Sequence, residues 1–270
     1  MNKKRINLIG GGFQHAKTST LNKESDLFEW QFNTYKNNIT VYVDYSIPLI
    51  LKDNNKTQKI GWMLESKSIV PNLLEFVILN LEILKQNCLF IITHHSKLVE
   101  LDPSFFKWAP AYGTYIDTIE IKNKNKLISM ITSKKMITEN HIKRINIANK
   151  YINKIDVFGR GFNEIEKKEI GLNDYAFSIA VENDCYDGYI TEKILDCFAT
   201  GTIPIYDGAP NIGKYFDING IIKYDNFALE ELTYDLYNSK KEYIINNLEL
   251  VKQFDILDEW IYKKYLVDYV

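Results

Sequence analysis

Residues 177–206, FSIAVENDCYDGYITEKILDCFATGTIPIY, predict a strand, a polar loop, a helix and a second strand. A nearly continuous apolar run at residues 176–181 is typical of a strand that is covered on both faces. The predicted helix, residues 190–200, carries on one face the apolar side chains Ile190, Ile194, Cys197 and Phe198. Gly201 stands where a helix C-terminus favours glycine, and residues 203–206 form the second apolar run. This βαβ pattern predicts a parallel sheet with a right-handed crossover.

Polar residues follow the first strand and begin the helix of this unit. They are Glu182, Asn183, Tyr189, Thr191, Glu192 and Lys193. Ligands of open α/β sheets bind beyond the carboxyl ends of the strands, where the N–H groups of a helix N-terminus favour an anion. A lysine in the first helical turn, such as Lys193, is electrostatically misplaced unless an anion is bound. The alternative is that Glu192 and Lys193 form only a solvated polar face.

Motifs along the C-terminal half resemble, in the same order, those of the α-1,3/4-fucosyltransferase family, in a bacterial or viral-like member. They are KLISMITS at 126–133, DVFGR at 156–160, VEN at 181–183, YITEKI at 189–194 and GTIPIYDGAP at 201–210. The likeness covers residues 126–227. Asp184 departs from the pattern, because the family usually has Ser or Thr at this place.

This resemblance implies an α/β protein of the GT-B type, in which two Rossmann-like domains face a cleft. It implies GDP-fucose as the donor, inversion at the anomeric carbon, and a glycan or glycolipid acceptor bound mainly by the N-terminal half. The donor-binding residues expected on this basis are Arg144, Gly159, Arg160, Glu182, Asn183, Tyr189, Thr191, Glu192 and Lys193. Arg144 matches the family's phosphate-binding arginine, and we expect Glu192 to accept hydrogen bonds from ribose hydroxyls. For Arg144 the alternative is a solvated basic helix face.

The charged run KNKNK at residues 122–126 is the best candidate for a linker. It predicts an N-terminal, acceptor-side domain over residues 1–122 and a C-terminal, donor-binding domain over residues 123–270. In the first domain the apolar pattern predicts strands at 6–9, 40–44, 59–64 and 88–92 and a helix at 73–84. In the second it predicts further strands at 127–131, 155–158 and 220–224 and helices at 134–152, 228–237 and 239–266.

An inverting transfer needs a carboxylate or a histidine that takes the proton of the acceptor hydroxyl. We expect Glu65 to be this catalytic base, because it follows the strand at 59–64 and falls roughly where fucosyltransferases carry a glutamate. His15 and Asp44, near the ends of other N-terminal strands, are the competing acceptor-side candidates. The alternative for Glu65 is a structural role, in which it caps or forms a salt bridge with the following segment.

The sequence predicts neither a metal ion nor a cofactor. No Asp-x-Asp occurs in the chain, and no second cluster of metal ligands accompanies the pair His94-His95. Charge on a leaving diphosphate can be stabilised by protein cations instead of a metal. We therefore expect Arg144 and Lys193, assisted by the helix N-terminus, to neutralise the diphosphate of the donor.

Composition narrows the class of protein. A net charge of −2 argues against nucleic-acid binding, and three cysteines without CxxC spacing argue against a disulfide framework. The N-terminal apolar run is too short for a signal peptide and no stretch reaches membrane-span length, so a cytoplasmic protein is expected. Trp260, Tyr262 and Tyr265, beside two lysines, allow a weak membrane-surface contact, although packing on the protein is favoured. The oligomeric state stays open.

Two other functions remain open at this point. One is a glycosyltransferase that uses another nucleotide sugar. The other is a nucleotide-binding protein without transferase activity, which would keep Arg144 and Lys193 but lack a catalytic base. Hydrolysis of a panel of nucleotide sugars discriminates among the three.

Overall fold

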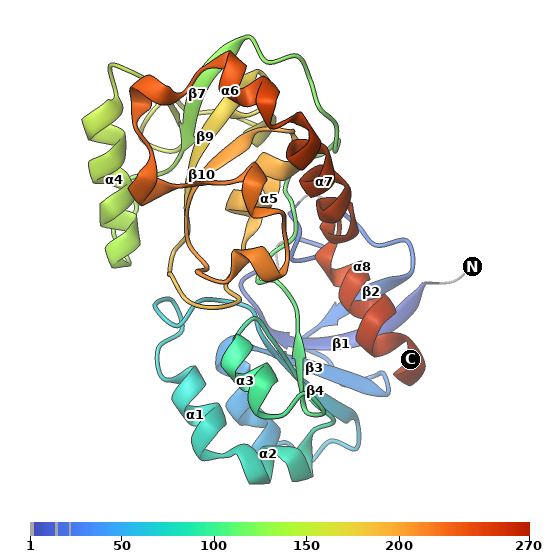
Figure 1. The fold of residues 1–270 in the computed structure, drawn as a ribbon. Coiled ribbons are helices and arrows are strands. Elements are labelled where there is room, and N and C mark those ends of the chain that lie inside the picture. Colours follow the sequence, from blue (N-terminus) through green and yellow to red (C-terminus); the bar gives the residue numbers. More distant parts are fainter. Residues whose placement is uncertain (1–2, 14–15, 22) are drawn as a thin grey trace. The chain divides into compact units, whose positions relative to one another are not determined.

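The computed structural model describes residues 3–13, 16–21 and 23–270, which divide into two compact units. Unit 1 consists of Met1–Gly113, Asp187–Tyr189 and Ile256–Val270, and unit 2 of Thr114–Tyr186 and Ile190–Asp255. Each unit contains one sheet with parallel strands, which confirms the α/β class (Figure 1). The units differ from the predicted halves 1–122 and 123–270, because residues 114–122 belong to unit 2 and residues 256–270 to unit 1.

Unit 1 is built on a six-stranded sheet in the order β2-β1-β3-β4-β5-β6. The strands are β1 (Lys4–Gly10), β2 (Phe28–Phe32), β3 (Ile39–Val43), β4 (Gln58–Met63), β5 (Ile91–Thr93) and β6 (Phe106–Trp108). The strands predicted around β1, β3, β4 and β5 are confirmed, although β5 is shorter than residues 88–92. Sequence reasoning missed β2, whose apolar residues alternate with polar ones over only five positions, and the three-residue β6.

The helices of unit 1 are short. They are η1 (Asp44–Leu51), α1 (Leu73–Leu79), α2 (Leu81–Asn87), α3 (Ser96–Leu101), α8 (Leu257–Ile261), the π-helical η8 (Tyr262–Leu266) and η9 (Val267–Tyr269). The single helix predicted over residues 73–84 is wrong. It is interrupted at Asn80, which leaves the helical backbone conformation and donates its side-chain amide to Phe76 O at 2.8 Å.

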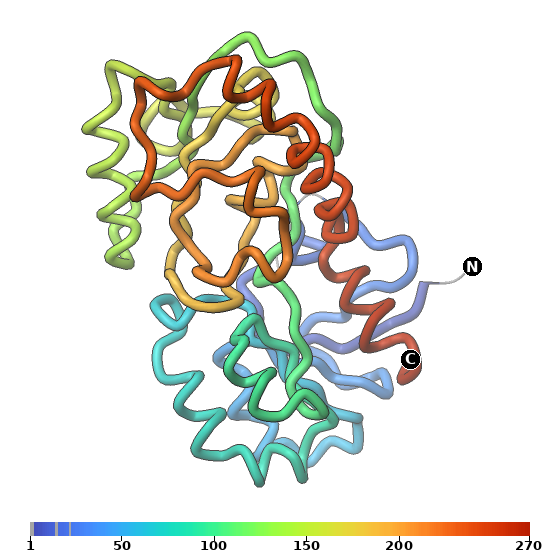
Figure 2. Tube along the Cα trace, viewed as in Figure 1, coloured from blue at the N-terminus to red at the C-terminus, as the bar shows by residue number. Residues whose placement is uncertain are grey.

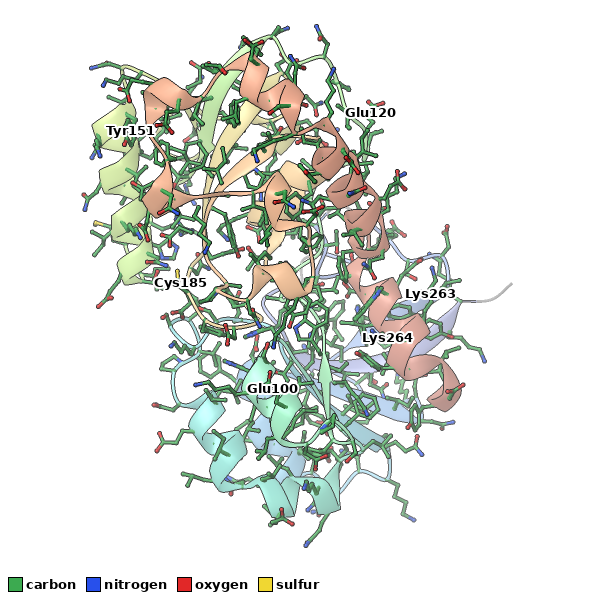
Figure 3. The ribbon with its side chains drawn as sticks, in the orientation of Figure 1. Glu100, Glu120, Tyr151, Cys185, Lys263 and Lys264 are labelled. Atoms are coloured by element: carbon green, nitrogen blue, oxygen red, sulfur yellow. The ribbon has the colours of Figure 1, made fainter. Side chains whose placement is uncertain are left out.

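The C-terminal residues of unit 1 run beside its first two strands (Figure 2). Tyr262 stacks on Phe28 with ring centroids 5.0 Å apart, and Tyr265 donates to Trp108 O at 2.7 Å. The favoured packing of these aromatic rings on the protein is therefore confirmed, whereas Lys263 and Lys264 lie exposed (Figure 3). No helix within residues 3–13, 16–21 and 23–270 has the length and apolar character of a membrane span.

Unit 2 is built on a five-stranded sheet in the order β11-β10-β9-β7-β8. Its strands are β7 (Lys126–Ile131), β8 (Asp156–Phe158), β9 (Tyr175–Val181), β10 (Ile203–Asp207) and β11 (Ile222–Lys223). The α-helices are α4 (Glu139–Tyr151), α5 (Glu192–Ala199), α6 (Tyr234–Ser239) and α7 (Lys241–Val251). Short 3-10 helices connect them, namely η2 (Lys168–Gly171), η3 (Ile212–Lys214), η4 (Ile218–Gly220), η5 (Tyr224–Asn226), η6 (Leu229–Glu231) and η7 (Lys252–Phe254).

The central βαβ unit is confirmed as β9, α5 and β10. Helix α5 begins after its N-cap Thr191 and ends before Gly201, whose φ of 66° is left-handed and therefore favours glycine. An added Cβ at Gly201 would lie 2.6 Å from Ile121 Cγ1. The sheet packs on α4 and α6 through a core that includes Phe177, Ile147 and Tyr237.

Four predictions for the C-terminal half need correction. The single helix predicted over residues 228–237 is divided into η6 and α6, because Thr233 between them is an extended N-cap residue. Helix α4 begins at Glu139 rather than at residue 134, because Thr138 and His141 form a reciprocal capping box. The long helix predicted over residues 239–266 is divided into α7, η7, α8 and η8. Residues 122–126 are not a solvated linker throughout, because Lys124 Nζ donates to Thr200 O at 2.8 Å and to Asn173 O at 2.9 Å.

Candidate functional site

The strand order of unit 2 creates a topological switch point between β7 and β9. The chain leaves β7 through α4 toward β8, and it leaves β9 through α5 toward β10, in the opposite direction along the sheet. With right-handed crossovers the two helices cover opposite faces, so their N-termini flank the carboxyl ends of β7 and β9 (Figure 1). This is the position at which open α/β sheets bind ligands.

Arg144 reaches this point from α4. Its side chain is buried, and it donates from Nη1 to Val181 O at 2.9 Å and from Nη2 to Asn183 Oδ1 at 3.0 Å. These bonds fix Arg144 and Asn183 at the carboxyl end of β9. The solvated-face alternative for Arg144 is therefore wrong, and two of the five N–H groups of its guanidinium are used for this attachment.

Arg144 and Lys193 both contact the chain at the carboxyl end of β9, where Arg144 Nη1 donates to Val181 O and Lys193 Nζ lies 3.7 Å from Glu182 Oε2. Burial and, in addition, the positive charges of Arg144 and Lys193 lower the pKa of His141 to about 4. His141 accepts a hydrogen bond on Nδ1 from the backbone N–H of Thr138, which it can do as a neutral imidazole. The structure thus brings the two predicted cations together beside a neutral side chain.

The charge of Lys193 is compensated within the protein. Its Nζ lies 3.0 Å from Glu192 Oε1 and 3.7 Å from Glu182 Oε2, and it also contacts the hydroxyl of Thr191 at 3.3 Å. The expectation that this lysine is misplaced without an anion therefore needs correction. A bound diphosphate would compete with these carboxylates for the ammonium group.

Glu182 is fully buried at the start of the loop that leads to α5. Its two carboxylate oxygens accept hydrogen bonds from the backbone N–H of Thr191 at 3.0 Å and from the Thr191 hydroxyl at 2.5 Å. Burial raises the pKa of Glu182, while Lys193 and Thr191 oppose this rise. The buried pair Glu182 and Thr191 fixes the first turn of α5, and the predicted donor contact of these two residues stays a prediction.

Glu192 is held between two lysines, of which sequence reasoning identified only Lys193. Lys168 of η2 lies 3.5 Å from Glu192 Oε1 and 2.7 Å from Asp196 Oδ2. Burial disfavours the charged form of Glu192, but Lys193 and Lys168 outweigh it and lower the pKa of Glu192 to about 2. A carboxylate that stays ionised is suited to accept hydrogen bonds from hydroxyl groups.

Gly159 and Arg160 follow β8. Gly159 has a φ of 110°, and a Cβ on it would lie only 2.0 Å from Thr132 O, so this turn requires glycine. Arg160 is exposed, and its backbone carbonyl accepts a bond from Lys134 N. Beside this turn, the buried hydroxyl of Thr132 has no hydrogen-bond partner in the described part of the chain, a feature that no sequence pattern indicated.

Tyr189 belongs to unit 1, unlike the other predicted donor-binding residues. It is fully buried, and its ring lies edge-on against His94 with centroids 5.1 Å apart. The neighbouring Gly188 has a φ of 89°, and an added Cβ there would lie 2.1 Å from His94 O. The turn at residues 187–189 is therefore shaped to pack on the segment after β5.

The acceptor-side candidates lie at the carboxyl ends of the strands of unit 1. Asp44, after β3, is buried and accepts hydrogen bonds from Leu64 N at 2.8 Å and Glu65 N at 3.2 Å. Glu65, after β4, is half-buried and accepts a bond from the Tyr112 hydroxyl at 2.6 Å. His15 lies outside the described residues. The burial of Asp44 and its use by two backbone N–H groups favour Glu65 as the candidate base.

No group of three or more His, Cys, Asp or Glu side chains that could hold a metal ion occurs in the part of the chain that the structure describes. The rings of His94 and His95 pack against each other with centroids 4.5 Å apart. Burial, followed by the effect of His95, lowers the pKa of His94 well below its usual value.

Cys185, in the loop between β9 and α5, is exposed (Figure 3).

Comparison with known proteins confirms the resemblance that the motifs indicate. Residues 121–245 match the model of glycosyltransferase family 10 (fucosyltransferase), C-terminal part. An alpha-(1,3)-fucosyltransferase FucT of Helicobacter pylori is 35% identical over 89 residues, which cover 31% of this chain and 18% of that protein. An alpha-(1,4)-fucosyltransferase of Arabidopsis thaliana is 32% identical over 62 residues, 23% of this chain and 16% of that protein. The matched segments thus span less than a fifth of either relative.

Solved structures share the fold over a longer range. A crystal structure of an alpha1,3-fucosyltransferase superposes with a TM-score of 0.55 at 13% sequence identity, and it covers 100% of this chain and 92% of that one. A structure of an alpha1,3-fucosyltransferase with GDP-fucose gives a TM-score of 0.50 at 15% identity, with 92% and 81% of the two chains covered. At these identities the likeness establishes a common GT-B-like α/β fold.

Proposed function

We propose that this chain is a glycosyltransferase that transfers fucose from GDP-fucose to a hydroxyl group of a glycan or glycolipid, with inversion at the anomeric carbon. The observation that carries the proposal is the match of residues 121–245 to the fucosyltransferase family, within which Arg144 and Lys193 converge at the switch point of unit 2. We propose the cytoplasm as its location.

The leaving group of this reaction is GDP, on which negative charge grows as the bond to fucose breaks. Arg144 and Lys193, with the N–H groups at the start of α5, provide positive potential for that charge without a metal ion. Arginine suits a bidentate grip on a phosphate, whereas lysine acts as a point charge. Glu192, ionised and held by two lysines, is proposed to accept hydrogen bonds from the ribose hydroxyls.

On the acceptor side, Glu65 is proposed as the catalytic base. In a single displacement, the acceptor oxygen attacks the anomeric carbon, the bond to the diphosphate breaks, and the carboxylate takes the proton of the acceptor hydroxyl. The Glu65 carboxylate has two oxygens, of which Oε1 accepts the bond from Tyr112. The proton of the acceptor would go to the other oxygen.

Donor hydrolysis tests this function directly. The protein is incubated with GDP-fucose, GDP-mannose, UDP-glucose and UDP-galactose, and release of the nucleotide is followed over time. Preferential turnover of GDP-fucose supports the proposal, while turnover of another donor assigns a different glycosyltransferase. Binding of GDP without turnover of any donor, tested also with a panel of glycan acceptors, would make the chain a nucleotide-binding protein.

A further inference from the structure

Glu65 is held at three separate points within unit 1. Its backbone N–H donates to Asp44 Oδ1 at 3.2 Å, and its carbonyl oxygen lies 3.1 Å from His94 Nε2. Its carboxylate Oε1 accepts a bond from the Tyr112 hydroxyl at 2.6 Å. The three partners lie in the segments that follow β3, β5 and β6, so segments after three other strands of the same sheet fix the residue after β4.

Two of these contacts fix the backbone. Asp44 has a φ of 49°, an uncommon value for a residue other than glycine, and this conformation lets its carboxylate receive the N–H groups of Leu64 and Glu65. His94 is buried and neutral, and because a carbonyl oxygen can only accept, Nε2 carries the proton in this pair. The backbone of Glu65 is therefore fixed at both its N–H and its C=O group.

The third contact fixes the side chain. A hydroxyl that donates to a carboxylate forms a short, charge-assisted bond, and 2.6 Å is in the expected range. Within the described residues no other group hydrogen-bonds this carboxylate, so Oε2 is left for a proton from a substrate. A carboxylate with a purely structural role would be expected to have both oxygens engaged, as Glu182 has.

We propose that Tyr112 is a positioning residue that holds the Glu65 carboxylate in the orientation needed for proton transfer. The inference rests on the proposed function, because it gives Glu65 the role of base. The Tyr112 hydroxyl donates to Glu65 Oε1 and so restricts the side-chain rotamer of Glu65, while Asp44 and His94 restrict the backbone of Glu65. Correct orientation of a base can contribute strongly to the rate without any effect on donor affinity.

The test compares Tyr112→Phe with Tyr265→Phe. The two tyrosines are matched, because Tyr265 is also half-buried, lies in unit 1, and donates one hydrogen bond, to Trp108 O at 2.7 Å. We expect Tyr112→Phe to lower kcat for transfer by roughly tenfold or more, the scale of one hydrogen bond to a charged group, with GDP affinity unchanged. Tyr265→Phe should leave kcat at the parental value.

A double-mutant cycle with Glu65→Asp separates positioning from a general structural effect. Aspartate keeps a carboxylate, but its side chain is shorter by one methylene. We therefore expect the hydrogen bond to Tyr112 to be lost and transfer to be reduced in Glu65→Asp. If Tyr112 acts through this bond, Tyr112→Phe should cause little further loss in the Glu65→Asp background.

Each outcome decides the proposal. Losses that multiply in the double variant, a parental kcat for Tyr112→Phe, or a Tyr112→Phe protein that melts well below Tyr265→Phe would each overturn the role of Tyr112. Failure of the parent protein to turn over GDP-fucose would instead overturn the proposed function, and this is seen before any variant is compared.

Discussion

Individual residues at the start of α5 form an alternating set of charges. Lys193 lies between Glu182 and Glu192, and Lys168 lies between Glu192 and Asp196. In such a set every charged group has a neighbour of opposite charge. A diphosphate that binds here would therefore compete with carboxylates for lysines that are already paired. Of the two lysines in this set, Lys193 is the one in the first turn of α5, and 22% of its side chain is exposed.

Replacement of Lys193 tests the role of this lysine. Lys193→Ala should lower transfer by roughly 10²-fold or more, the scale on which loss of one electrostatic donor to a developing charge acts. Rates with GDP-fucose give the measurement, and Lys150→Ala, an exposed lysine of α4, is the matched control. Parental turnover by Lys193→Ala would show that the diphosphate is neutralised elsewhere.

Glu65→Gln tests the catalytic base. Glutamine keeps the size of the side chain and an oxygen that can accept from Tyr112, but it removes basicity. We expect GDP binding to persist and transfer to be lost, both measured on one preparation, with Glu75→Gln on α1 as the control. Transfer near the parental rate would pass the role to His15 or Asp44, and loss of GDP binding would mean that Glu65 is structural.

Asp44 should make folding stability depend on pH. Burial raises its pKa to about 7, while the N–H groups of Leu64 and Glu65 oppose this rise. The unfolded pKa is about 3.9, so between about pH 4 and pH 7 the folded state binds the extra proton and folding stability falls as the pH rises. Melting temperatures at pH 5 and pH 8 should therefore differ more in the parent than in Asp44→Asn, which does not titrate. An equal pH dependence in both proteins would contradict this assignment.

At the scale of an element, α5 is held at both ends by residues from outside the helix. Glu182 binds its N-cap Thr191, and Lys124 donates to Thr200 O just beyond its C-terminus. In its middle, Asp196 accepts from the Thr114 hydroxyl at 2.9 Å and from Tyr115 N at 2.7 Å, besides its pair with Lys168. A short helix of eight residues is thus fixed along its length, which keeps Glu192 and Lys193 in place.

Loss of Lys168 should destabilise unit 2. Lys168→Met leaves Asp196, 2% exposed, without its cation, and we expect a loss of about 2–3 kcal/mol in the free energy of unfolding, less than for a fully buried pair because Lys168 is partly exposed. The adjacent Lys167, which pairs with Asp117 on the surface, provides the control, and Lys167→Met should show no measurable change. Denaturant unfolding gives both values. Equal stability of the two variants would show that Asp196 does not depend on Lys168.

At the scale of the whole molecule, the sequence predicts what local patterns encode. Buried parallel strands such as β9 are continuous apolar runs, and the βαβ unit with its Gly201 terminus could therefore be read directly. The return of residues 256–270 to unit 1 depends on Asp258, which accepts bonds from Ser19 and from Trp30 Nε1 at 2.7 Å. Contacts between residues more than 200 positions apart leave no periodic pattern in the sequence. The shorter-range contacts of Lys168 with Glu192 and of Tyr112 with Glu65 leave none either.

The charge balance of the proposed reaction predicts that transfer does not require a divalent metal ion. The diphosphate carries negative charge that must be stabilised as it leaves, and this chain offers Arg144, Lys193 and the N–H groups of α5 at one point of unit 2. Turnover of GDP-fucose should therefore continue at the parental rate in EDTA, and added Mn²⁺ or Mg²⁺ should not raise it. The measurement is repeated with Lys193→Ala, because a metal ion that replaces the lysine would restore part of the lost rate only in that variant. Complete loss of parental activity in EDTA, restored by Mn²⁺ or Mg²⁺, would show that the protein cations are insufficient and that a metal ion carries the charge of the leaving group.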